Sequence, residues 1–368
     1  MLKSFIGNSI CRVMSGVAAT IFSLLVGVPV AAHQASAVPV SAAMHHVVKQ
    51  HTAIRELPIW KLPNVDRAVE SYFSSDSKRL IFYAKSTQSD TYNIHTVDTD
   101  GGHLRRINKL GQDACSFFFP DRSRVVFTST KDNLDMPRGN WSHVKNYPQG
   151  AELYTANLDG SDVKRLTNNA YYDAEVSLSP DGQWILFTRQ INGRLDLWRM
   201  RPDGRDVRQI THSPDLQEGG SFYMPDSETI LFRAWNFSDE DKMDKAMEIY
   251  TVKHDGTALT QLTHDGGVNW APYPTPDGKH FVFAKMHPPY NYEIHLMNIK
   301  TGEQRQLTDD RAFDGFPSIS PDGRLLSFSS SRGNAKGERK LSIFLMDISS
   351  LNVGPVPLTA NESMASSH

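Results

Sequence analysis

The sequence predicts an all-β protein, a six-bladed β-propeller built from four-stranded antiparallel blades. Three observations predict this fold: a turn motif that recurs six times, a common spacing of 45 residues between its copies, and the same order of short strands after each copy. The chain has 368 residues, which is long enough for one large all-β domain. Its 18 Phe, 12 Tyr and 6 Trp favour strands over helices.

The turn motif is "SPDG" at 179–182 and 320–323, with the variants "SSDS" (74–77), "FPDR" (119–122), "MPDS" (224–227) and "TPDG" (275–278). The shared aspartates are Asp76, Asp121, Asp181, Asp226, Asp277 and Asp322. Their spacings are 45, 60, 45, 51 and 45 residues, a base period of 45 with two insertions. A period of this length is typical of propeller blades.

Each period contains four short segments with strand patterns. One precedes the turn, and a second such as "WILFTR" follows it. A third such as "LDLWRM" leads through an Asp-Gly turn to a fourth such as "VRQIT", and turns of this kind suit tight hairpins. The second segment always carries a phenylalanine six residues after the shared aspartate, and we expect all six to be buried: Phe82, Phe127, Phe187, Phe232, Phe283 and Phe328.

Six complete units fit within residues 67–360, followed by a tail at 361–368. The sixth unit has a fourth segment of its own, "PVPLT" at 355–359, so no strand needs to come from elsewhere in the chain. Within the N-terminal segment 38–66, "AIRELPIW" (53–60) is a possible additional strand. Pro58 would confine it to an outer edge.

Residues 1–37 are typical of a secretory signal peptide, with Lys3 and Arg12, an apolar run at 16–32 and small residues before a cleavage point after Ala32 or Ala37. An uncleaved membrane anchor is the alternative. Cleavage would leave 37 basic and 41 acidic residues and one cysteine, Cys115. We therefore expect a periplasmic or secreted monomer without stable membrane insertion. This charge balance does not favour nucleic acid as a partner.

Every long insertion is expected on one face of the propeller, because the strands of a blade alternate in direction. The opposite face has only tight turns. The face that carries the insertions, which we call the loop face, is therefore the candidate for function. On it, the position eight residues before each shared aspartate is polar in five of six units, namely Asp113, Asp173, Glu218, Asn269 and Asp314, with Ala68 in the first. Two further acids, Glu70 and Glu175, stand six residues before it.

Three explanations of these acids remain open. They cap turns through their own backbone, they are neutralised by bases, or they bind a cation or a cationic segment. Bases follow the second segment of every unit, at Lys85, Lys131, Arg189, Arg233, Lys285 and Arg332. Several unpaired acids close together would repel by an amount comparable with the stability of a domain. We therefore expect Arg189 and Arg332 to pair with acids. Glu70 and Glu175 have no dedicated base, and two explanations of them stay open: they are free for a cationic ligand, or they simply reach solvent in a wide channel.

The units resemble the TolB-like propeller repeat across residues 68–359, most closely in "FDGFPSISPDGRLLSFSSSRGN" (313–334) and "AEVSLSPDGQWILFTRQINGRLDLWRMRPDGRDVRQIT" (174–211). The resemblance implies that the acid before the first strand and the arginine after the second are general features of the repeat, matched here by Asp173, Asp314, Arg189 and Arg332. TolB carries an α/β domain ahead of its propeller. Residues 38–67 are too few for one, so we expect a free-standing secreted relative.

The function expected from these features is non-catalytic binding of a protein or peptide partner in the cell envelope, around the central channel. No cofactor is expected, with Ca²⁺ as the one possible ion. The alternative is a metal-dependent, lyase-like enzyme acting on saccharides at the channel mouth. His143, His212, His264 and His287 are near the loops such a metal site would use, without a tight ligand spacing. His95 and His295 occupy an aromatic position of the third strand and are expected in the core.

Overall fold

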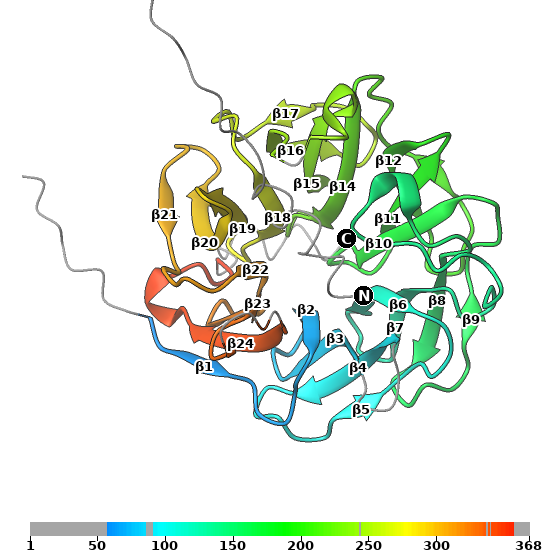
Figure 1. Ribbon diagram of the computed structural model, residues 1–368, viewed down its shortest axis with the longest axis horizontal. Helices are drawn as coiled ribbons and strands as arrows, with labels where there is room; N and C mark the ends of the chain where they lie inside the picture. The colour runs from blue at the N-terminus through cyan, green and yellow to red at the C-terminus, as the bar shows by residue number, and fades with distance from the viewer. Residues whose placement is uncertain (1–56, 86–90, 243, 336–337, 339, 357–368) are drawn as a thin grey trace, which may run out of the picture. The chain divides into compact units, whose positions relative to one another are not determined.

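The propeller is a ring of six antiparallel sheets, each of four strands, in a computed structural model that describes residues 57–85, 91–242, 244–335, 338 and 340–356 (Figure 1). This confirms the predicted fold class. The signal peptide predicted at 1–37 and the tail at 361–368 lie outside the described residues. Within the described part of the chain, no helix is long and apolar enough to cross a membrane.

The first three blades follow the chain from the innermost strand outwards. Blade 1 is β2 (Ala68–Phe73), β3 (Arg79–Lys85), β4 (Tyr92–Asp98) and β5 (Arg105–Arg106). Blade 2 is β6 (Asp113–Phe118), β7 (Arg124–Ser129), β8 (Glu152–Asn157) and β9 (Lys164–Arg165). Blade 3 is β10 (Tyr172–Leu178), β11 (Ile185–Ile191), β12 (Arg194–Met200) and β13 (Arg208–Gln209).

The next two blades repeat this order. Blade 4 is β14 (Leu216–Tyr223), β15 (Thr229–Asn236), β16 (Met247–Lys253) and β17 (Thr260–Gln261). Blade 5 is β18 (Asn269–Pro274), β19 (His280–His287), β20 (Asn291–Asn298) and β21 (Gln304–Gln306). The described residues also form short 3₁₀ turns at η1 (Val144–Asn146), η2 (Phe237–Asp239) and η3 (Ser349–Leu351).

The sixth blade joins the two ends of the propeller. Its strands are β22 (Asp314–Ile319), β23 (Leu325–Ser330), β24 (Ser342–Asp347) and, outermost, β1 (Ile59–Lys61). Trp60 pairs with Leu345, and the amide of Asp347 donates to the carbonyl of Pro58 over 2.9 Å. The expectation that "PVPLT" supplies this strand is therefore wrong: the N-terminal segment occupies the edge of β24 and closes the ring.

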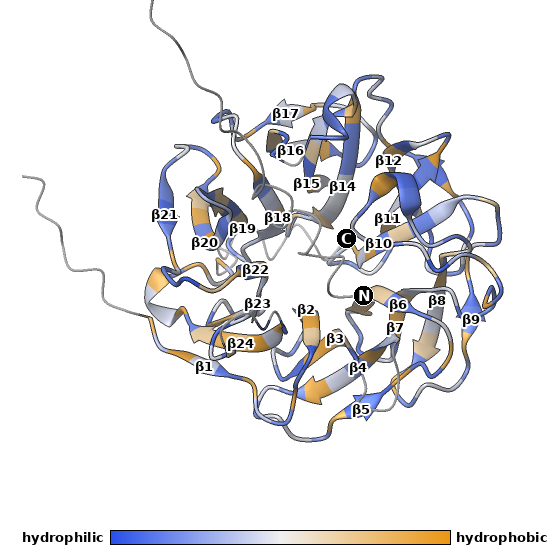
Figure 2. Cartoon of the chain, viewed as in Figure 1, coloured by the Kyte–Doolittle hydropathy of each residue, from blue (hydrophilic) through white to orange (hydrophobic). Residues whose placement is uncertain are grey.

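Aromatic residues at repeated positions of the second and third strands account for the packing of the core. All six phenylalanines of the second strands are fully buried, as predicted. Each lies opposite an aromatic side chain of the third strand, and Phe127–Tyr154 and Phe232–Tyr250 stack at 5.8 and 5.7 Å between ring centroids. His95 and His295 fill this position against Phe82 and Phe283, at 5.9 and 5.7 Å. Hydrophobic residues accordingly concentrate in the strands and hydrophilic ones in the loops (Figure 2).

In blades 2 to 5, a threonine that follows the short outer strand fixes its end. Thr167, Thr211, Thr263 and Thr308 accept a backbone N–H from the third strand of their blade over 2.8–3.0 Å. The outer strands are only two or three residues long, so these bonds replace ladder contacts that the strands lack. They also hold the start of the connection that leads to the next innermost strand.

Candidate functional site at the loop end of the inner strands

Every innermost strand carries a β-bulge at the same place. The bulged residue has a positive φ in all six, although only one is a glycine: Glu70 (54°), Cys115 (34°), Glu175 (53°), Gly220 (56°), Ala271 (50°) and Phe316 (53°). A bulge interrupts strand alternation and redirects the side chain. We call these six residues the bulge ring, and all of them are partly exposed.

The residues two positions earlier behave differently. Ala68, Asp113, Asp173, Glu218, Asn269 and Asp314, which we call the seam ring, are at most 1% exposed. A regular strand would direct Asp173 and Glu175, two residues apart, to the same side. Because the strand bulges at Glu175, the two side chains have different surroundings. The seam ring lies where each blade meets the connection from the preceding blade.

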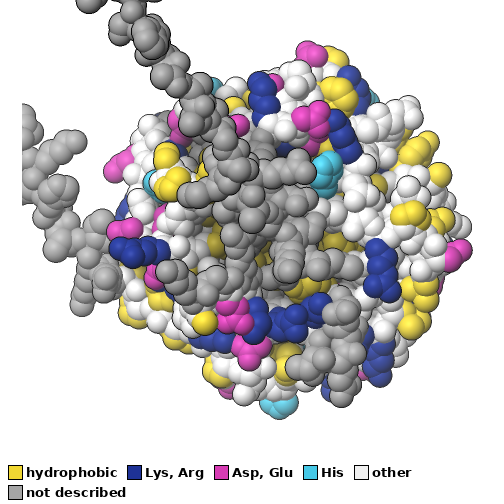
Figure 3. Space-filling view, viewed as in Figure 1, with side chains coloured by type: hydrophobic (Ala, Val, Ile, Leu, Met, Phe, Trp, Pro, Cys, Tyr) yellow, Lys and Arg dark blue, Asp and Glu magenta, His cyan; other side chains and the backbone are white. Residues whose placement is uncertain are grey.

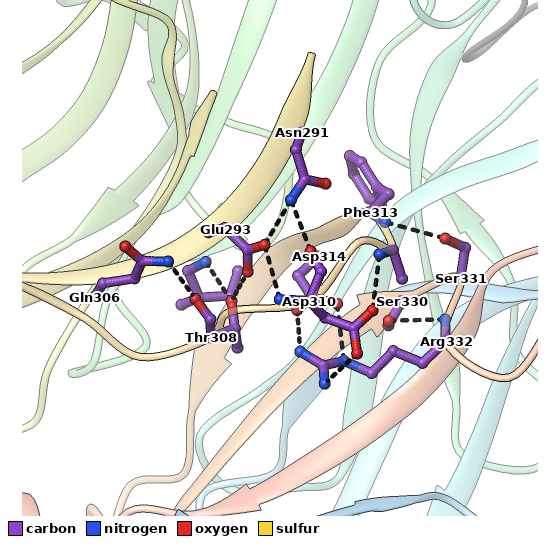
Figure 4. Close-up of polar contacts among 12 residues, drawn as sticks. Asn291, Glu293, Gln306, Thr308, Asp310, Phe313, Asp314, Ser330, Ser331 and Arg332 are labelled. Carbon is purple, nitrogen blue, oxygen red and sulfur yellow. Dashed lines mark hydrogen bonds and ion pairs between the residues drawn. The ribbon is translucent and has the colours of Figure 1, made fainter. Parts of the chain in front are cut away.

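Two seam acids are held by arginines, as predicted. Arg189 binds Asp173 with two hydrogen bonds, Nε–Oδ1 at 2.6 Å and Nη2–Oδ2 at 2.8 Å. Arg332 binds both oxygens of Asp314, and its Nη1 lies 3.1 Å from Asp310 Oδ2 (Figure 4). Paired arginine–carboxylate bonds of this kind are the strong ones. The pairing and turn explanation therefore holds for these acids.

The seam between blades 5 and 6 shows how such acids join neighbouring blades. Glu293 of β20 accepts from Thr308 Oγ1 over 2.6 Å and from the amide of Asp310 over 3.0 Å, which places Asp310 beside Arg332 (Figure 4). Asn291 Nδ2 donates to both Glu293 and the carbonyl of Asp310, each at 2.7 Å. These polar groups satisfy one another across the blade boundary.

Two other seam residues, Asp113 and Asn269, are held by hydrogen bonds that involve side-chain amides, and neither is paired with a basic side chain among the described residues. Asp113 accepts from Asn93 Nδ2 (3.1 Å), the Ile94 amide (3.0 Å) and Asn108 Nδ2 (2.6 Å) of blade 1. Burial raises the pKa of Asp113 to about 6 despite these bonds. Lys131 pairs with Asp132 at 2.5 Å and not with Asp113.

Asn269 donates to Glu248 Oε2 over 3.0 Å and to Asp265 Oδ1 over 2.8 Å. Lys285, the base of this unit, contacts Asp265 and Gln304. Lys285 therefore stabilises the connection that leads into β18 through its contact with Asp265.

The base of blade 4, Arg233, binds an acid of blade 3 and not the seam acid of its own blade; we call this pairing the exchange of Arg233. Arg233 Nη2 bonds Glu175 Oε1 of the neighbouring blade over 2.8 Å, and the Gly220 amide donates to Glu175 Oε2 over 2.7 Å. Burial would raise the pKa of Glu175, but the Arg233 charge and these bonds lower it below the ordinary value. The expectation that Glu175 has no basic partner is therefore wrong.

Two glycines permit this exchange. A Cβ atom on Gly219 would fall on the Glu175 carboxylate, and one on Gly220 would fall on the Arg233 guanidinium. Because Arg233 is engaged, Glu218 of its own blade has no arginine and contacts Thr211 Oγ1. Burial raises the pKa of Glu218 to about 7.

Glu70 is the bulge-ring acid without a basic partner among the described residues. Its Oε1 accepts from Tyr72 Oη over 2.7 Å, and the Cys115 thiol lies 3.8 Å from Oε2. Burial raises the pKa of Glu70, and the nearby Glu175 charge raises it further, against the lowering effect of the Tyr72 bond. A carboxylate in this position gains from a cationic neighbour.

Aromatic rings close the centre of the propeller just below the bulge ring. Tyr72 of blade 1 lies 5.3 Å from Phe222 of blade 4 on the opposite side, and 5.2 and 5.8 Å from Phe117 and Tyr273. Phe222 and Tyr273 lie 4.8 Å apart. Glu70 therefore stands above an aromatic floor, in contrast to the wide channel we had considered.

The surroundings of the bulge ring are asymmetric. On blades 5 and 6, Trp270 packs edge-on against Phe316 at 4.5 Å, and Phe313 and Tyr292 extend this partly exposed aromatic cluster. On blades 2 to 4, the insertion at 129–150 reaches across blade 3. Lys145 pairs with Asp241 at 2.6 Å, which fixes it to the insertion at 234–246. On the face of the molecule in Figure 3, acidic and basic side chains are intermixed.

The residues considered for a metal do not converge. His143, His212 and His264 are exposed, and His287 Nε2 lies 2.9 Å from His295 Nε2. In the described ranges, no three His, Cys, Asp or Glu side chains are grouped so that they could hold a metal ion. These four histidines therefore do not form a shared metal site within the described part of the chain.

Sequence reasoning missed the bulge, the exchange of Arg233 and the aromatic floor. The "GG" at 219–220 was the one signal for the exchange, because paired glycines in a strand indicate close approach by another group. A common offset could have indicated the aromatic floor, because four aromatic residues all stand four positions before a shared aspartate: Tyr72, Phe117, Phe222 and Tyr273.

Comparison with known proteins agrees with this architecture. The TolB β-propeller domain profile matches residues 192–358. A TolB homolog of Chlorobium luteolum is 28% identical over 169 residues, 44% of this chain and 35% of that protein. Four curated relatives are matched over only 28% to 62% of their own lengths.

Two solved structures illustrate the range of proteins that share the fold. TolB from Acinetobacter baumannii matches with a TM-score of 0.56 and 20% identity, over 77% of this chain and 66% of that one. An oligogalacturonate lyase in complex with manganese matches with a TM-score of 0.54 and 16% identity, over 77% of each chain. Similarity at this identity extends to the fold alone.

Proposed function

We propose that this chain, a TolB-like six-bladed β-propeller, is a non-catalytic binding protein of the cell envelope that holds a protein or peptide partner at its bulge ring. The observation that carries the proposal is Glu70. It is an acid in a partly buried ring with no base within reach in the described part of the chain, whereas Glu175 in the same ring has Arg233.

The chemistry around Glu70 favours a cationic group next to an apolar one. A lysine or arginine of a partner would supply the missing positive charge, and its insertion would favour the ionised form of Glu70. The aromatic cluster of Trp270, Phe313 and Phe316 offers contact area for an apolar side chain. A free Ca²⁺ ion would find one unpaired carboxylate here, which is far fewer oxygen ligands than Ca²⁺ requires.

The experiment is recovery of a partner from envelope extract with the purified, immobilised protein. Wild type, Glu70→Gln and the control Glu303→Gln are compared, since Glu303 is exposed in the turn between β20 and β21. We expect the same specific protein with wild type and Glu303→Gln, and its loss with Glu70→Gln. Equal recovery with all three variants would contradict the proposal.

The enzymatic alternative has a separate test. Oligogalacturonate with Mn²⁺ is incubated with the purified protein and the formation of unsaturated product is followed. We expect no turnover, because the described histidines and acids do not form a metal site. Turnover that disappears in a chelator would replace the binding proposal with a lyase.

A further inference from the structure

Two histidines of blade 5 face each other near the loop end of the β19–β20 hairpin. His287 is the last residue of β19, and its Nε2 lies 2.9 Å from Nε2 of His295 in β20. The ring centroids are 5.2 Å apart, and the ring planes differ by only 21°. Nearly coplanar rings at these two distances point at each other nitrogen to nitrogen, which is the geometry of a single N–H···N hydrogen bond. We call these two residues the histidine pair.

The buried member of the pair determines which ring donates. His295 is 7% exposed, and its Nδ1 is buried without a hydrogen-bond partner among the described residues. A neutral imidazole carries one N–H group, and an N–H at Nδ1 of His295 would be a buried donor without an acceptor. His295 therefore donates from Nε2, and Nε2 of His287 accepts.

This arrangement has no place for a second proton. A proton on Nε2 of His287 would set two N–H groups against each other, and a proton on Nδ1 of His295 would bury a charged, unsatisfied donor. Burial, and after it the neighbouring His287 and Lys285, lowers the pKa of His295 to about 4, against the opposite effect of Asp265. Protonation of the pair therefore requires His287 to turn away towards solvent, to which it is already partly exposed.

The charged groups around the pair do not favour an imidazolium. Lys285 of β19 and Glu293 of β20 are cross-strand partners in the register between the two histidines. Lys285 contacts Asp265 of the connection before β18, and Glu293 accepts from Thr308 Oγ1 and the amide of Asp310. Among the described residues, neither imidazole is hydrogen-bonded to an acid. These acids are thus engaged elsewhere, and the nearest base adds to the cost of a proton on the pair.

Blade 1 shows that the fold does not require such a pair. His95 occupies the position of His295 against Phe82, and its Nδ1 lies 2.9 Å from the backbone carbonyl of Asn93, to which it donates. The other four blades have non-titrating aromatic side chains or a tyrosine at this position, namely Tyr154, Trp198, Tyr250 and Phe344. Blade 5 alone among the described blades has a histidine here that is bonded to a second histidine.

The pair holds one end of an exposed loop. Residues 288–290 are exposed, and the amide of Tyr290 donates to the carbonyl of His287 over 2.9 Å. Side chains tie both ends of the loop to the blade: His287 through His295 at one end, and Asn291 through Glu293 at the other. When His287 turns away, the first of these ties is lost and the second remains.

We propose that the histidine pair is an acid-sensitive latch, which holds the start of the β19–β20 loop on β20 while both rings are neutral and releases it when the pair takes up a proton. A group whose folded pKa is lowered stabilises the fold above its ordinary pKa of 6.5, and this contribution is lost as pH falls towards 4. The latch therefore opens within this range. The inference does not rest on the proposed function, because the loop responds to acid whether or not a partner binds at the bulge ring.

The test is backbone hydrogen exchange of the full chain at pH 7.5 and pH 5.5, with protection factors corrected for the intrinsic exchange rates. We expect the protection of the segment 284–292 to fall about tenfold at pH 5.5, because a proton favours the open loop by about one pKa unit there. The segment 185–191 of β11 is the internal reference and should keep its protection. Equal protection of 284–292 at both pH values, or a parallel fall in 185–191, would overturn the proposal.

Matched variants assign the response to the pair. His295→Phe introduces the residue type that blade 6 has at this position, and we expect the protection of 284–292 to become the same at both pH values. His95→Phe in blade 1 is the control and should keep the tenfold fall. Should His295→Phe fail to fold, His287→Gln is the second variant, since glutamine faces His295 with a polar group that does not titrate. A tenfold fall that persists in either folded variant would show that the pair is not the latch.

Discussion

The seam ring and the bulge ring are two residues apart on the same six strands, yet their side chains are held in opposite ways. Seam residues are buried, and their polar members bond to an arginine, an amide, a carboxylate, a hydroxyl or a backbone N–H. Bulge residues are partly exposed, and Glu70 has no base among the residues described. Acids at the start of a propeller strand are therefore not one class, and a bulge separates structural acids from a candidate binding acid.

Asp173→Ala should have the largest effect on this comparison. It leaves the Arg189 guanidinium buried without a counter-charge, which should lower the free energy of unfolding by about 3–5 kcal/mol. Chemical denaturation measures the change. Asp132→Ala, which breaks the surface pair with Lys131, is the control and should cost no more than about 1 kcal/mol. Similar losses in both variants would mean that the seam is not specially stabilising.

Glu218→Gln sharpens the comparison through pH. The folded pKa of Glu218, about 7, is raised above the ordinary 4.5, so its contribution to stability is complete below pH 4.5 and is lost as pH rises through 7. The wild type should lose roughly 3 kcal/mol by pH 8 through this group, and the glutamine variant should not. Urea unfolding at pH 5, 6, 7 and 8 measures the difference. Parallel pH profiles for the two proteins would refute the assignment.

Gly220→Ala tests the exchange of Arg233 between blades. The substitution adds a Cβ where the guanidinium lies, at a φ of +56°. Gly193→Ala is the matched control, because Gly193 also has a positive φ but nothing within 4 Å of its added Cβ. Backbone strain should cost about 1 kcal/mol in both variants, and displacement of Arg233 from Glu175 about 1–3 kcal/mol more at Gly220. Equal losses would mean that the Arg233 pair contributes little.

The features that could be predicted from the sequence are those that stand at fixed positions within the repeat. Six blades, the buried phenylalanines and the pairs of Arg189 and Arg332 all follow from fixed offsets to the shared aspartate. The sequence could not predict the Glu175–Arg233 pair, which joins residues 58 positions apart in different blades. Five of the six bulged residues are not glycine, so the bulge had no sequence signal. "PVPLT" misled because it matches the outer-strand pattern, while β1 holds the edge of β24.

Glu70→Gln should have the smallest effect on folding, below about 1 kcal/mol, because burial raises the pKa of this acid and the substitution breaks no ion pair among the described residues. Asp113→Asn is its counterpart in the seam ring, since both acids have raised pKa values and no base. At pH 7, above the pKa of about 6 at which Asp113 becomes a carboxylate, the change should cost about 1–3 kcal/mol, because an amide nitrogen would face the donors of Asn93 and Asn108.

The most direct test of the division between the two rings is to measure the free energy of unfolding and partner recovery on the same preparations of Glu70→Gln and Asp113→Asn. We predict that Glu70→Gln keeps wild-type stability and loses the partner, while Asp113→Asn loses stability and keeps the partner under conditions where it is folded. If Glu70→Gln recovers the partner as well as wild type does, or if it unfolds as readily as Asp113→Asn, the bulge ring is not a binding site distinct from the seam.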